Sequence, residues 1–488
     1  MQRETPFFHG FQSVLFGRPA LSGVKKMLNK VAALNTLSDF FETFGFLIPD
    51  ALLQRNASGA NSRQRRFTLH VTFWAFLFQT LAPQTSCRET VRKVQAWWLL
   101  RSPAAAIGSA STAAYTKARQ RLGAEVILHI GHHLIDRMER RARPSQSWLG
   151  RCVKVVDGTT LSMPDTAENQ KIYPQPTSQK VGCGFPQMRL VGVFSLATGA
   201  MLDFAKSSIH VSESLLFGQL LARFNEGDIA LADRGFCSFH AFFHMMEAGI
   251  DAVIRLSAVR KVDYKKGQKL GENDWLVPWK KPVQRPKGCT PEQFAALPES
   301  MILRHIKVTI TARGHRSETV VLVTTLLDPL AYPAAKIAEL YLQRWSIELH
   351  FREIKITLGM DVLSCKTPVM VDKEVMMHSV SYNLIRALMQ EAAIRHDVDL
   401  SRISLKGTAD TLKSWSASFE AVRGKPRRQQ QLLDAMFEVI AKDLLPERPG
   451  REEPRAKKRR AKNYQHLTKP RHEMETPAHR NRPKTLLS

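Results

Sequence analysis

The stretch YLQRWSIELHFREIK, residues 341–355, carries four polar residues at offsets that an α-helix brings to one side. Tyr341, Arg344, Glu348 and Lys355 lie at about 0°, 300°, 340° and 320° on a helix that turns by about 100° per residue. Carboxylates bind hard metal ions through oxygen, and arginine and lysine neutralise phosphate oxygens. The stripe therefore predicts metal-assisted chemistry on a phosphodiester, and it requires further acidic residues elsewhere in the chain.

Two upstream aspartates follow short apolar runs that are typical of buried strands. Asp157 is expected to end the strand VKVVD, and Asp233 is expected to end the strand IALAD. A helix packed across two neighbouring strands would bring Glu348 beside both aspartates. Three close carboxylates repel one another unless divalent metal neutralises them, so the sequence predicts a two-metal site. Each aspartate alone is also typical of turn chemistry, and Glu348 alone could form a helix ion pair with Arg344 or Arg352.

The charge of the chain indicates a polyanionic partner. Its 488 residues carry a formal net charge of +27, and the pI is near 10.1. Residues 447–488 hold thirteen Lys and Arg against five Glu, which leaves +19 for residues 1–446. Because the folded body is itself basic, an extended DNA or RNA surface is favoured over an anionic lipid surface.

The sequence favours a cytoplasmic protein without a membrane partner. Its six cysteines lack zinc-ligand spacing and are typical of a reducing compartment, and its start lacks the pattern of a signal peptide. The most apolar run, residues 67–83, is shorter than the roughly 20 residues of a membrane span and contains His70 and Gln79. This run therefore predicts a buried core helix.

Changes in local pattern divide the chain into six parts, with an α/β core interrupted by an insertion. The expected parts are an N-terminal helical DNA-binding domain (1–145), the first part of the core (146–256), a β-rich insertion (257–330), the second part of the core with the signature helix (331–400), a C-terminal helical region (401–446) and a basic, disordered tail (447–488). In the N-terminal domain, Lys117 and Arg121 lie one helical turn apart. They face DNA or form an ordinary solvated surface, and both interpretations stay open.

These residues together resemble bacterial insertion-sequence transposases of the Asp-Asp-Glu type, in the insertion-sequence-four family with a Tyr-Arg-Glu-Lys signature and a β insertion before the Glu. The four stripe residues match the signature Y-x₂-R-x₃-E-x₆-K without gaps. The motifs DGT at 157–159 and ADRGF at 232–236 are similar to the two aspartate motifs of the family. The resemblance implies a ribonuclease-H-like fold, with a mixed sheet flanked by helices. It also implies that Asp157, Asp233 and Glu348 are catalytic and hold two Mg²⁺ ions, with Mn²⁺ as an alternative.

The resemblance further implies a transposase that binds terminal inverted repeats, cleaves at the ends and joins 3′-hydroxyls to target DNA. Such a protein is expected to act as a homodimer on DNA, in the bacterial cytoplasm and on the nucleoid when bound. Tyr341, Arg344 and Lys355 are implied to contact the DNA backbone near the cleaved end, and Arg234 is expected to contact DNA as well. Two alternatives stay open: a ribonuclease-H-like nuclease without strand transfer, and a non-catalytic DNA-binding regulator.

Two tryptophans of the insertion are candidates for base stacking. Some relatives stack a flipped base on an aromatic ring, and Trp275 and Trp279 of the insertion could serve. Plain packing is the favoured role for both. Trp345 is expected in the core, because it projects beside Tyr341 on the signature helix.

Overall fold

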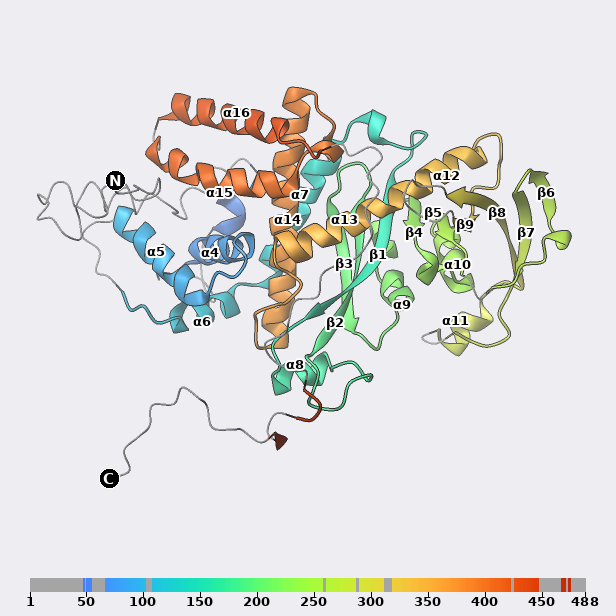
Figure 1. Ribbon diagram of the computed structural model, residues 1–488, viewed down its shortest axis with the longest axis horizontal. Helices are drawn as coiled ribbons and strands as arrows, with labels where there is room; N and C mark the ends of the chain where they lie inside the picture. Colours follow the sequence, from blue (N-terminus) through green and yellow to red (C-terminus); the bar gives the residue numbers. More distant parts are fainter. Residues whose placement is uncertain are drawn as a thin grey trace, which may run out of the picture.

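A mixed sheet with helices on its faces forms the centre of the protein (Figure 1). The computed structural model describes residues 47–48, 50–54, 66–101, 108–257, 260–286, 289–310, 318–422, 425–446, 467–470 and 473–474. The strands in this part of the chain are β1 (Val153–Ser162), β2 (Gln187–Ser195), β3 (Met201–Ser208), β4 (Ile229–Ala232), β5 (Asp251–Arg255), β6 (Gln268–Gly271), β7 (Asp274–Lys280), β8 (Ser300–Ile310) and β9 (Glu318–Thr324). The α-helices are α4 (Leu69–Leu81), α5 (Cys87–Arg101), α6 (Ala113–Arg121), α7 (Ala124–Arg140), α8 (Ala167–Ile172), α9 (Glu213–Gly218), α10 (Phe239–Glu247), α11 (Pro291–Ala295), α12 (Ala334–Leu342), α13 (Ser346–Arg352), α14 (Pro368–His396), α15 (Leu405–Ala421) and α16 (Pro426–Lys442).

The first five strands have the order β3-β2-β1-β4-β5. β1 and β2 are antiparallel, as are β2 and β3, whereas β4 is parallel to both β1 and β5. All four residues of β4 (IALA) are buried, as expected for a central parallel strand whose two faces are both covered. This order and these directions are those of the ribonuclease-H-like fold, so the predicted α/β class is confirmed.

The strands of the insertion extend this same sheet. β9 pairs antiparallel with β5, and β8, β7 and β6 follow outward to give the full order β3-β2-β1-β4-β5-β9-β8-β7-β6. A sheet edge carries a row of unpaired backbone N–H and C=O groups. Pairing with β9 satisfies the free edge of β5, so the insertion and the core share one continuous hydrogen-bond network.

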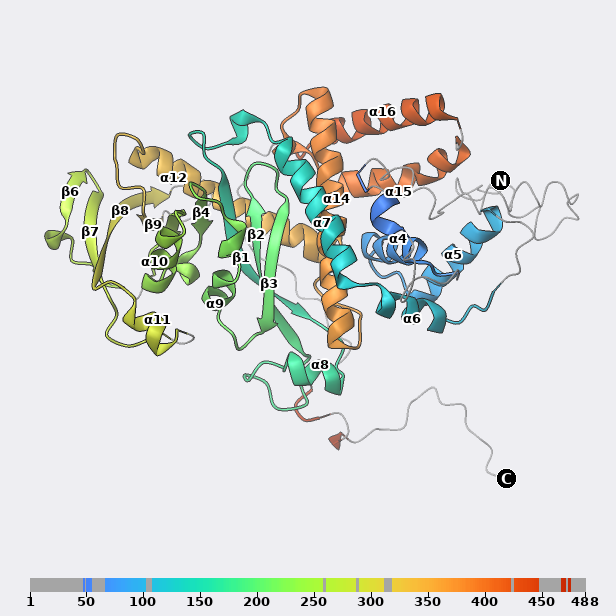
Figure 2. The ribbon, with the colours of Figure 1, turned by 180° about the vertical axis from the view of Figure 1, so that it is seen from behind.

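The 29-residue helix α14 lies between the sheet and the helices α4, α5 and α6, whereas α7 also contacts β3 (Figure 2). α14 packs against α4 and α7 from the N-terminal part of the chain and against α15 and α16 from the C-terminal part. α4 is buried along nearly its whole length, which confirms the core helix predicted for residues 67–83. Among the described residues, no helix is long and apolar enough to cross a membrane. Residues 1–46 and nearly all of the expected tail at 447–488 lie outside the described residues.

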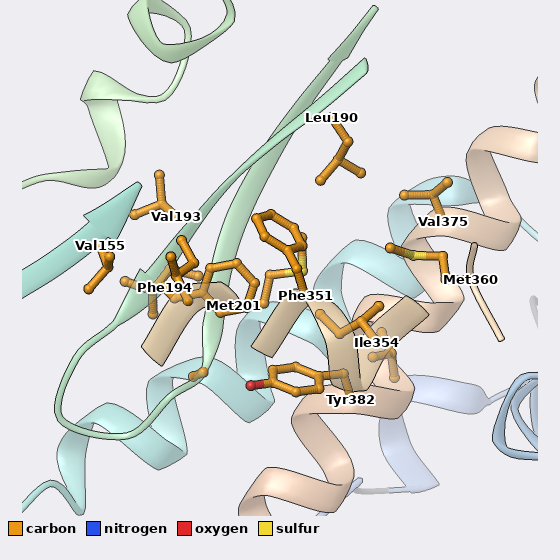
Figure 3. Packing of buried hydrophobic residues seen from close by; sticks show 14 of the residues in the cluster. Val155, Leu190, Val193, Phe194, Met201, Phe351, Ile354, Met360, Val375 and Tyr382 are labelled. Carbon is orange, nitrogen blue, oxygen red and sulfur yellow. The ribbon is translucent and has the colours of Figure 1, made fainter. Parts of the chain in front are cut away.

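Aromatic packing fixes α13 across the face of the sheet (Figure 3). The ring of Phe194 on β2 lies edge-on to Phe351 of α13 and to Tyr382 of α14, with centroid distances of 5.2 and 6.0 Å. The Tyr382 hydroxyl donates a hydrogen bond to the Gly199 carbonyl, at 2.8 Å, in the turn between β2 and β3. Burial of one such aromatic side chain contributes about 1.5–3 kcal/mol. Three elements therefore hold one another at the point where the signature helix crosses the strands.

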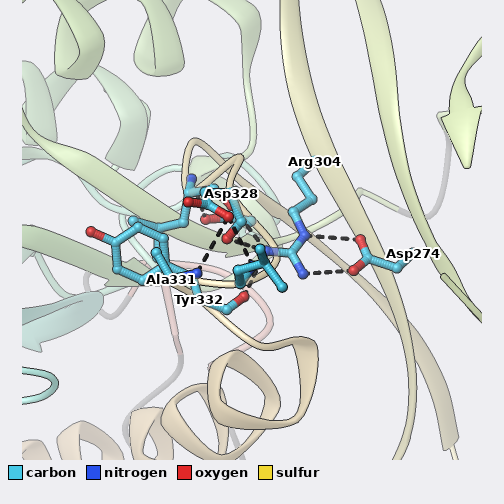
Figure 4. Close-up of polar contacts among 8 residues, drawn as sticks. Asp274, Arg304, Asp328, Ala331 and Tyr332 are labelled. Carbon is cyan, nitrogen blue, oxygen red and sulfur yellow. Dashed lines mark hydrogen bonds and ion pairs between the residues drawn. The ribbon is translucent and has the colours of Figure 1, made fainter. Parts of the chain in front are cut away.

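A buried ion pair joins the insertion to the loop that leads into α12 (Figure 4). Arg304 of β8 is fully buried and donates two hydrogen bonds to Asp274 of β7, from Nε at 2.9 Å and from Nη2 at 2.6 Å. Its Nη1 donates to the carbonyl oxygens of Leu326 and Tyr332 at 3.2 and 2.7 Å. Since these carbonyls precede α12, Arg304 holds the start of α12 against the insertion strands β7 and β8.

We expect Asp274→Ala to destabilise the fold strongly. The substitution leaves the guanidinium of Arg304 buried without its carboxylate, and removing one partner of a buried pair costs about 3–5 kcal/mol. The free energy of unfolding, measured with urea, should fall by about this amount. The control is Glu339→Ala, which removes an exposed ion pair with Lys336 on α12 and should leave the unfolding midpoint nearly unchanged. Equal stability of the two variants would contradict the structural role of the Arg304–Asp274 pair.

Candidate active site

Two aspartates lie side by side where the parallel pairing of β1 and β4 ends. Val156 pairs with Ala232, and Asp157 and Asp233 are the next residues of their strands. β4 ends at Ala232, one residue before the expected end at Asp233, whereas β1 continues to Ser162 in its antiparallel pairing with β2. The expectation that Asp157 ends its strand is therefore wrong, because β2 supplies hydrogen-bond partners to β1 beyond the end of β4.

Local backbone amides orient both carboxylates. Asp157 Oδ1 accepts a hydrogen bond from the Gly158 amide, and Asp233 Oδ1 accepts one from the Gly235 amide, both at 2.8 Å. Each bond involves a residue at most two positions away, so the orientation is built into the strand ends themselves.

The signature stretch is not one uninterrupted α-helix. A 3₁₀ turn, η6 (Gln343–Trp345), separates α12 from α13, and a π-helical turn, η7 (Glu353–Thr357), follows α13. Both turns depart from 3.6 residues per turn, so the angles of a regular α-helix do not hold along the whole stretch. Short π-helical turns inside helices frequently occur at functional sites.

The signature side chains differ in burial and in what they contact. Tyr341 and Arg344 are 3% and 8% exposed, whereas the side chain of Glu348 is 54% exposed. Lys355 lies in the π-helical turn and reaches β1, where its Nζ donates to Thr159 Oγ1 at 3.3 Å. Arg344 thus lies near Asp157 on β1, and Lys355 contacts Thr159, two residues further along the same strand.

The guanidinium of Arg344 lies between two of the predicted acidic residues. Its Nη2 donates a hydrogen bond to Glu348 Oε1 at 3.1 Å, and its Nη1 is 3.9 Å from Asp157 Oδ2. Its Nε is buried and has no hydrogen-bond partner within the described chain. The rings of Tyr341 and Trp345 flank the guanidinium, with centroids 5.9 and 5.6 Å away.

Burial and crowding of acids perturb Asp157. Desolvation is the main cause that raises the pKa of Asp157 from 3.8 to about 6, and the neighbouring Asp233 and Glu213 carboxylates add to the increase. The hydrogen bond from Gly158 and the charge of Arg344 oppose it. A second carboxylate and partial burial are the conditions under which a divalent cation is favoured as counter-charge.

Glu213, the first residue of α9, is a further acidic residue at this site that sequence reasoning missed. A Cβ atom at Gly158 would lie 2.4 Å from Glu213 Cδ, and one at Gly235 would lie 3.8 Å from Glu213 Oε2. The glycine after Asp157 therefore makes room for this carboxylate, and the glycine two residues after Asp233 lies close to it. Arg189 lies 3.7 Å from Glu213. Glycines directly after or near the two aspartates are the only signal of this neighbour in the sequence, and they do not identify which residue fills the space.

The donor set fits a hard divalent cation, because Asp157, Asp233 and Glu348 all offer carboxylate oxygens. In the described residues, however, no group of three His, Cys, Asp or Glu side chains is close enough to hold an ion. The guanidinium of Arg344 lies 3.1 Å from a Glu348 oxygen and 3.9 Å from an Asp157 oxygen, so it occupies space between these two acids.

The other predicted DNA contacts lie at different distances from the acids. Arg234 follows Asp233 directly and is exposed. Lys117 is exposed and Arg121 is partly buried on α6, which lies with α4 and α5 on the far side of α14 from the sheet (Figure 1). The structure therefore places Arg234 at the acidic site and places Lys117 and Arg121 on a separate surface.

The tryptophans differ from the expectations at one position. Trp345 is 41% exposed and is not a core residue, because it lies in the 3₁₀ turn while Ile347 and Phe351 are the residues buried against the sheet. Trp279 is buried and packs against Phe242, with ring centroids 5.6 Å apart. Packing is therefore the role that the structure gives to Trp279.

The chain is similar to known transposases. A family model described as a transposase DDE domain matches residues 148–384, a range that spans β1 and the signature helix. The transposase InsG of insertion sequence element IS4 from Escherichia coli is 25% identical over 375 residues, covering 76% of this chain and 81% of that protein. The putative transposase InsZ of the same organism is 29% identical over 126 residues, covering 26% of this chain and 42% of that protein. Among solved structures, the piggyBac transposase synaptic complex with hairpin DNA covers 87% of this chain and 86% of its own at 11% identity, with a TM-score of 0.40.

Asp157→Asn should stabilise the protein at pH 8 in the presence of a chelator. The pKa of Asp157 is about 6 in the folded protein and near 3.8 when unfolded, so the folded state binds the extra proton and loses stability as the pH rises between these values. The neutral amide avoids this loss, which is at most about 3 kcal/mol. The stabilisation, measured by urea unfolding, should decrease toward zero as the pH falls from 7 to 4. The exposed Asp410→Asn serves as control, and a pH-independent difference for Asp157→Asn would contradict the prediction.

Gly158→Ala should destabilise the fold by less than about 1 kcal/mol, because the added methyl group overlaps the flexible end of the Glu213 side chain, which can shift away. In a double-mutant cycle, Glu213→Ala should remove most of this penalty. Gly218→Ala, at the last residue of α9, is the matched control, since a Cβ there meets no atom within 4 Å. An equal penalty for Gly158→Ala with and without Glu213 would show that the carboxylate does not occupy this position.

Proposed function

Because this chain is a DNA transposase of the Asp-Asp-Glu type, related to those of bacterial insertion sequences, we propose that it processes the ends of its own element. In this proposal it binds the terminal inverted repeats, cleaves the DNA there and joins the freed 3′-hydroxyls to target DNA. The observation that carries the proposal is the register of β1 and β4, which brings Asp157 and Asp233 together beneath the helix that carries Glu348.

In the proposed site, Asp157, Asp233 and Glu348 hold divalent metal, two Mg²⁺ ions or Mn²⁺ in their place. Such ions supply activation of the attacking water or 3′-hydroxyl and stabilise the leaving oxygen. The protein contributes the orientation of the carboxylates. The amides of Gly158 and Gly235 fix one oxygen of each aspartate, and Glu348 projects from a helix held by buried aromatic side chains.

The remaining signature residues are proposed to hold the DNA end. Burial, the main cause, raises the pKa of Tyr341 to about 12, so its hydroxyl stays protonated and can donate to a phosphate oxygen. Arg344 is a cation near Asp157, Lys355 contacts Thr159 two residues further along β1, and the exposed Arg234 adds a further cation. Charge-assisted contacts of this kind position the phosphate backbone and carry little sequence information.

The region around α6, with Lys117 and Arg121, is proposed to belong to an N-terminal DNA-binding domain that covers residues 1–145. Its separation from the acidic site suits contacts to the inverted repeat away from the cleaved bond. Transposition requires two ends to be held together, so a homodimer on DNA is part of the proposal.

Glu348→Gln should abolish metal-dependent cleavage while DNA binding persists. The amide keeps the size of the side chain but loses the anionic oxygen ligand, and cleavage should fall by on the order of 10³-fold or more. The measurement is incubation with Mg²⁺ and DNA that carries the element's ends, with products resolved on a denaturing gel. Binding is followed separately by gel shift.

Glu339→Gln on α12 is the matched control and should cleave normally, since its exposed side chain pairs only with Lys336 among the contacts described. Undiminished cleavage by Glu348→Gln would contradict the site assignment. Cleavage by the wild-type protein without joined products, even when target DNA is present, would favour a nuclease without strand transfer. Binding without any cleavage would favour a DNA-binding regulator.

A further inference from the structure

We propose that Arg344 is an internal counter-cation of the active site, which a divalent metal ion must displace from Asp157 and Glu348. This inference deepens the proposed function and rests on its assignment of these two carboxylates as metal ligands. Arg344 then has two successive partners, the carboxylates before metal binding and a DNA phosphate after it. Metal binding and DNA binding become linked through one side chain.

Arg344 is buried against protein carboxylates and is not an exposed side chain that only DNA could contact. It is 8% exposed, and its guanidinium is directed at protein carboxylates, with Nη2 3.1 Å from Glu348 Oε1 and Nη1 3.9 Å from Asp157 Oδ2. By contrast, the Glu348 side chain is 54% exposed and open to an incoming ion. The guanidinium thus neutralises the acids from the protein side, while one of them stays accessible.

A metal ion and the guanidinium compete for these two carboxylates. Carboxylate oxygens lie about 2.0–2.6 Å from a bound Mg²⁺ or Ca²⁺ ion, so two carboxylates that share one ion are drawn close together. At present a planar guanidinium fills the space between Asp157 and Glu348, and it contacts one oxygen of each. Drawing both carboxylates onto one ion therefore requires the guanidinium to leave the space between them.

Electrostatics favours the exchange when metal is available. Asp233 and Glu213 add two further negative charges near Asp157, and both raise its pKa. A divalent cation offsets this charge better than one guanidinium does. Once released, Arg344 keeps contact with the rings of Tyr341 and Trp345, and its Nε, which has no hydrogen-bond partner in the described chain, can donate to a phosphate oxygen.

The exchange couples the affinity for metal to the affinity for DNA. If metal releases Arg344 for phosphate, then phosphate must in turn raise the affinity for metal by the same factor. Before DNA arrives, Arg344 weakens metal binding. The site is therefore completed preferentially when DNA is in place, which would limit hydrolysis at unintended positions.

The test measures Mn²⁺ binding by the full-length protein without DNA, from the loss of the electron paramagnetic resonance signal of free Mn²⁺. Arg344→Gln keeps a polar side chain but removes the competing charge, and it should bind Mn²⁺ about tenfold more tightly than the wild type. Arg344→Met is a second variant that removes the hydrogen bonds as well, and it should also bind more tightly. Circular dichroism and urea unfolding check that each variant is folded.

Arg352→Ala is the charge control, since it removes one exposed positive charge from the adjacent helix α13 and should change the affinity little. Asp157→Asn and Glu348→Gln should both weaken Mn²⁺ binding, which tests the ligand assignment of the proposed function separately. If these two variants bind Mn²⁺ normally, the ligand assignment fails and the inference falls with it. If they bind weakly but both Arg344 variants bind no more tightly than wild type and Arg352→Ala, the inference alone is overturned.

Discussion

The parallel register of β1 and β4 is the constraint on which the acidic site depends. Asp157 and Asp233 meet because Val156 is paired with Ala232. A slip of one residue would turn every side chain of β4 to the opposite face of the sheet and carry Asp233 away from Asp157. The register is specified by burial, since all four residues of β4 are enclosed in the core. The packing of the apolar side chains of β4 therefore determines the position of the two aspartates.

The irregular helix adds a second level of positioning. Ile347, Phe351 and Ile354 are buried against the sheet and fix which side of the helix faces it. The 3₁₀ turn before Ile347 and the π-helical turn that contains Ile354 change the directions of the polar residues at both ends. As a result Lys355 contacts β1 directly, while Arg344 is held between carboxylates. A regular α-helix with the same sequence would not give these residues the same neighbours.

The sequence predicted the features that depend on local pattern. The strand before Asp233 and the core helix at 67–83 follow from short apolar runs, and a matched signature pointed to the stretch at 341–355. Contacts between distant segments could not be foreseen in this way. Glu213 lies in a six-residue helix far along the chain from Asp157. The only sequence feature related to its position is the presence of glycines where a larger residue would meet its side chain.

Two other differences between expectation and structure have related causes. Trp345 was expected in the core because a regular helix places it beside Tyr341, but the 3₁₀ turn leaves it partly exposed. The extent of β1 beyond Asp157 depends on pairing with β2, a partner that no property of the strand itself reveals. The exposure of Trp345 and the length of β1 both depend on the backbone geometry of neighbouring segments. The residue type at a single position does not reveal that geometry.

The continuation of the sheet into the insertion also limits how such a protein can change. β9 covers the edge of β5, and Arg304 ties the next strand to the entrance of α12. A shortened chain without β6–β9 would expose the full edge of β5 next to an apolar core, and exposed edges of this kind recruit other chains into aggregates. Loss of the insertion during evolution would therefore need a replacement strand or cover at the same time, so this segment behaves as an obligatory part of the scaffold and not as a removable module.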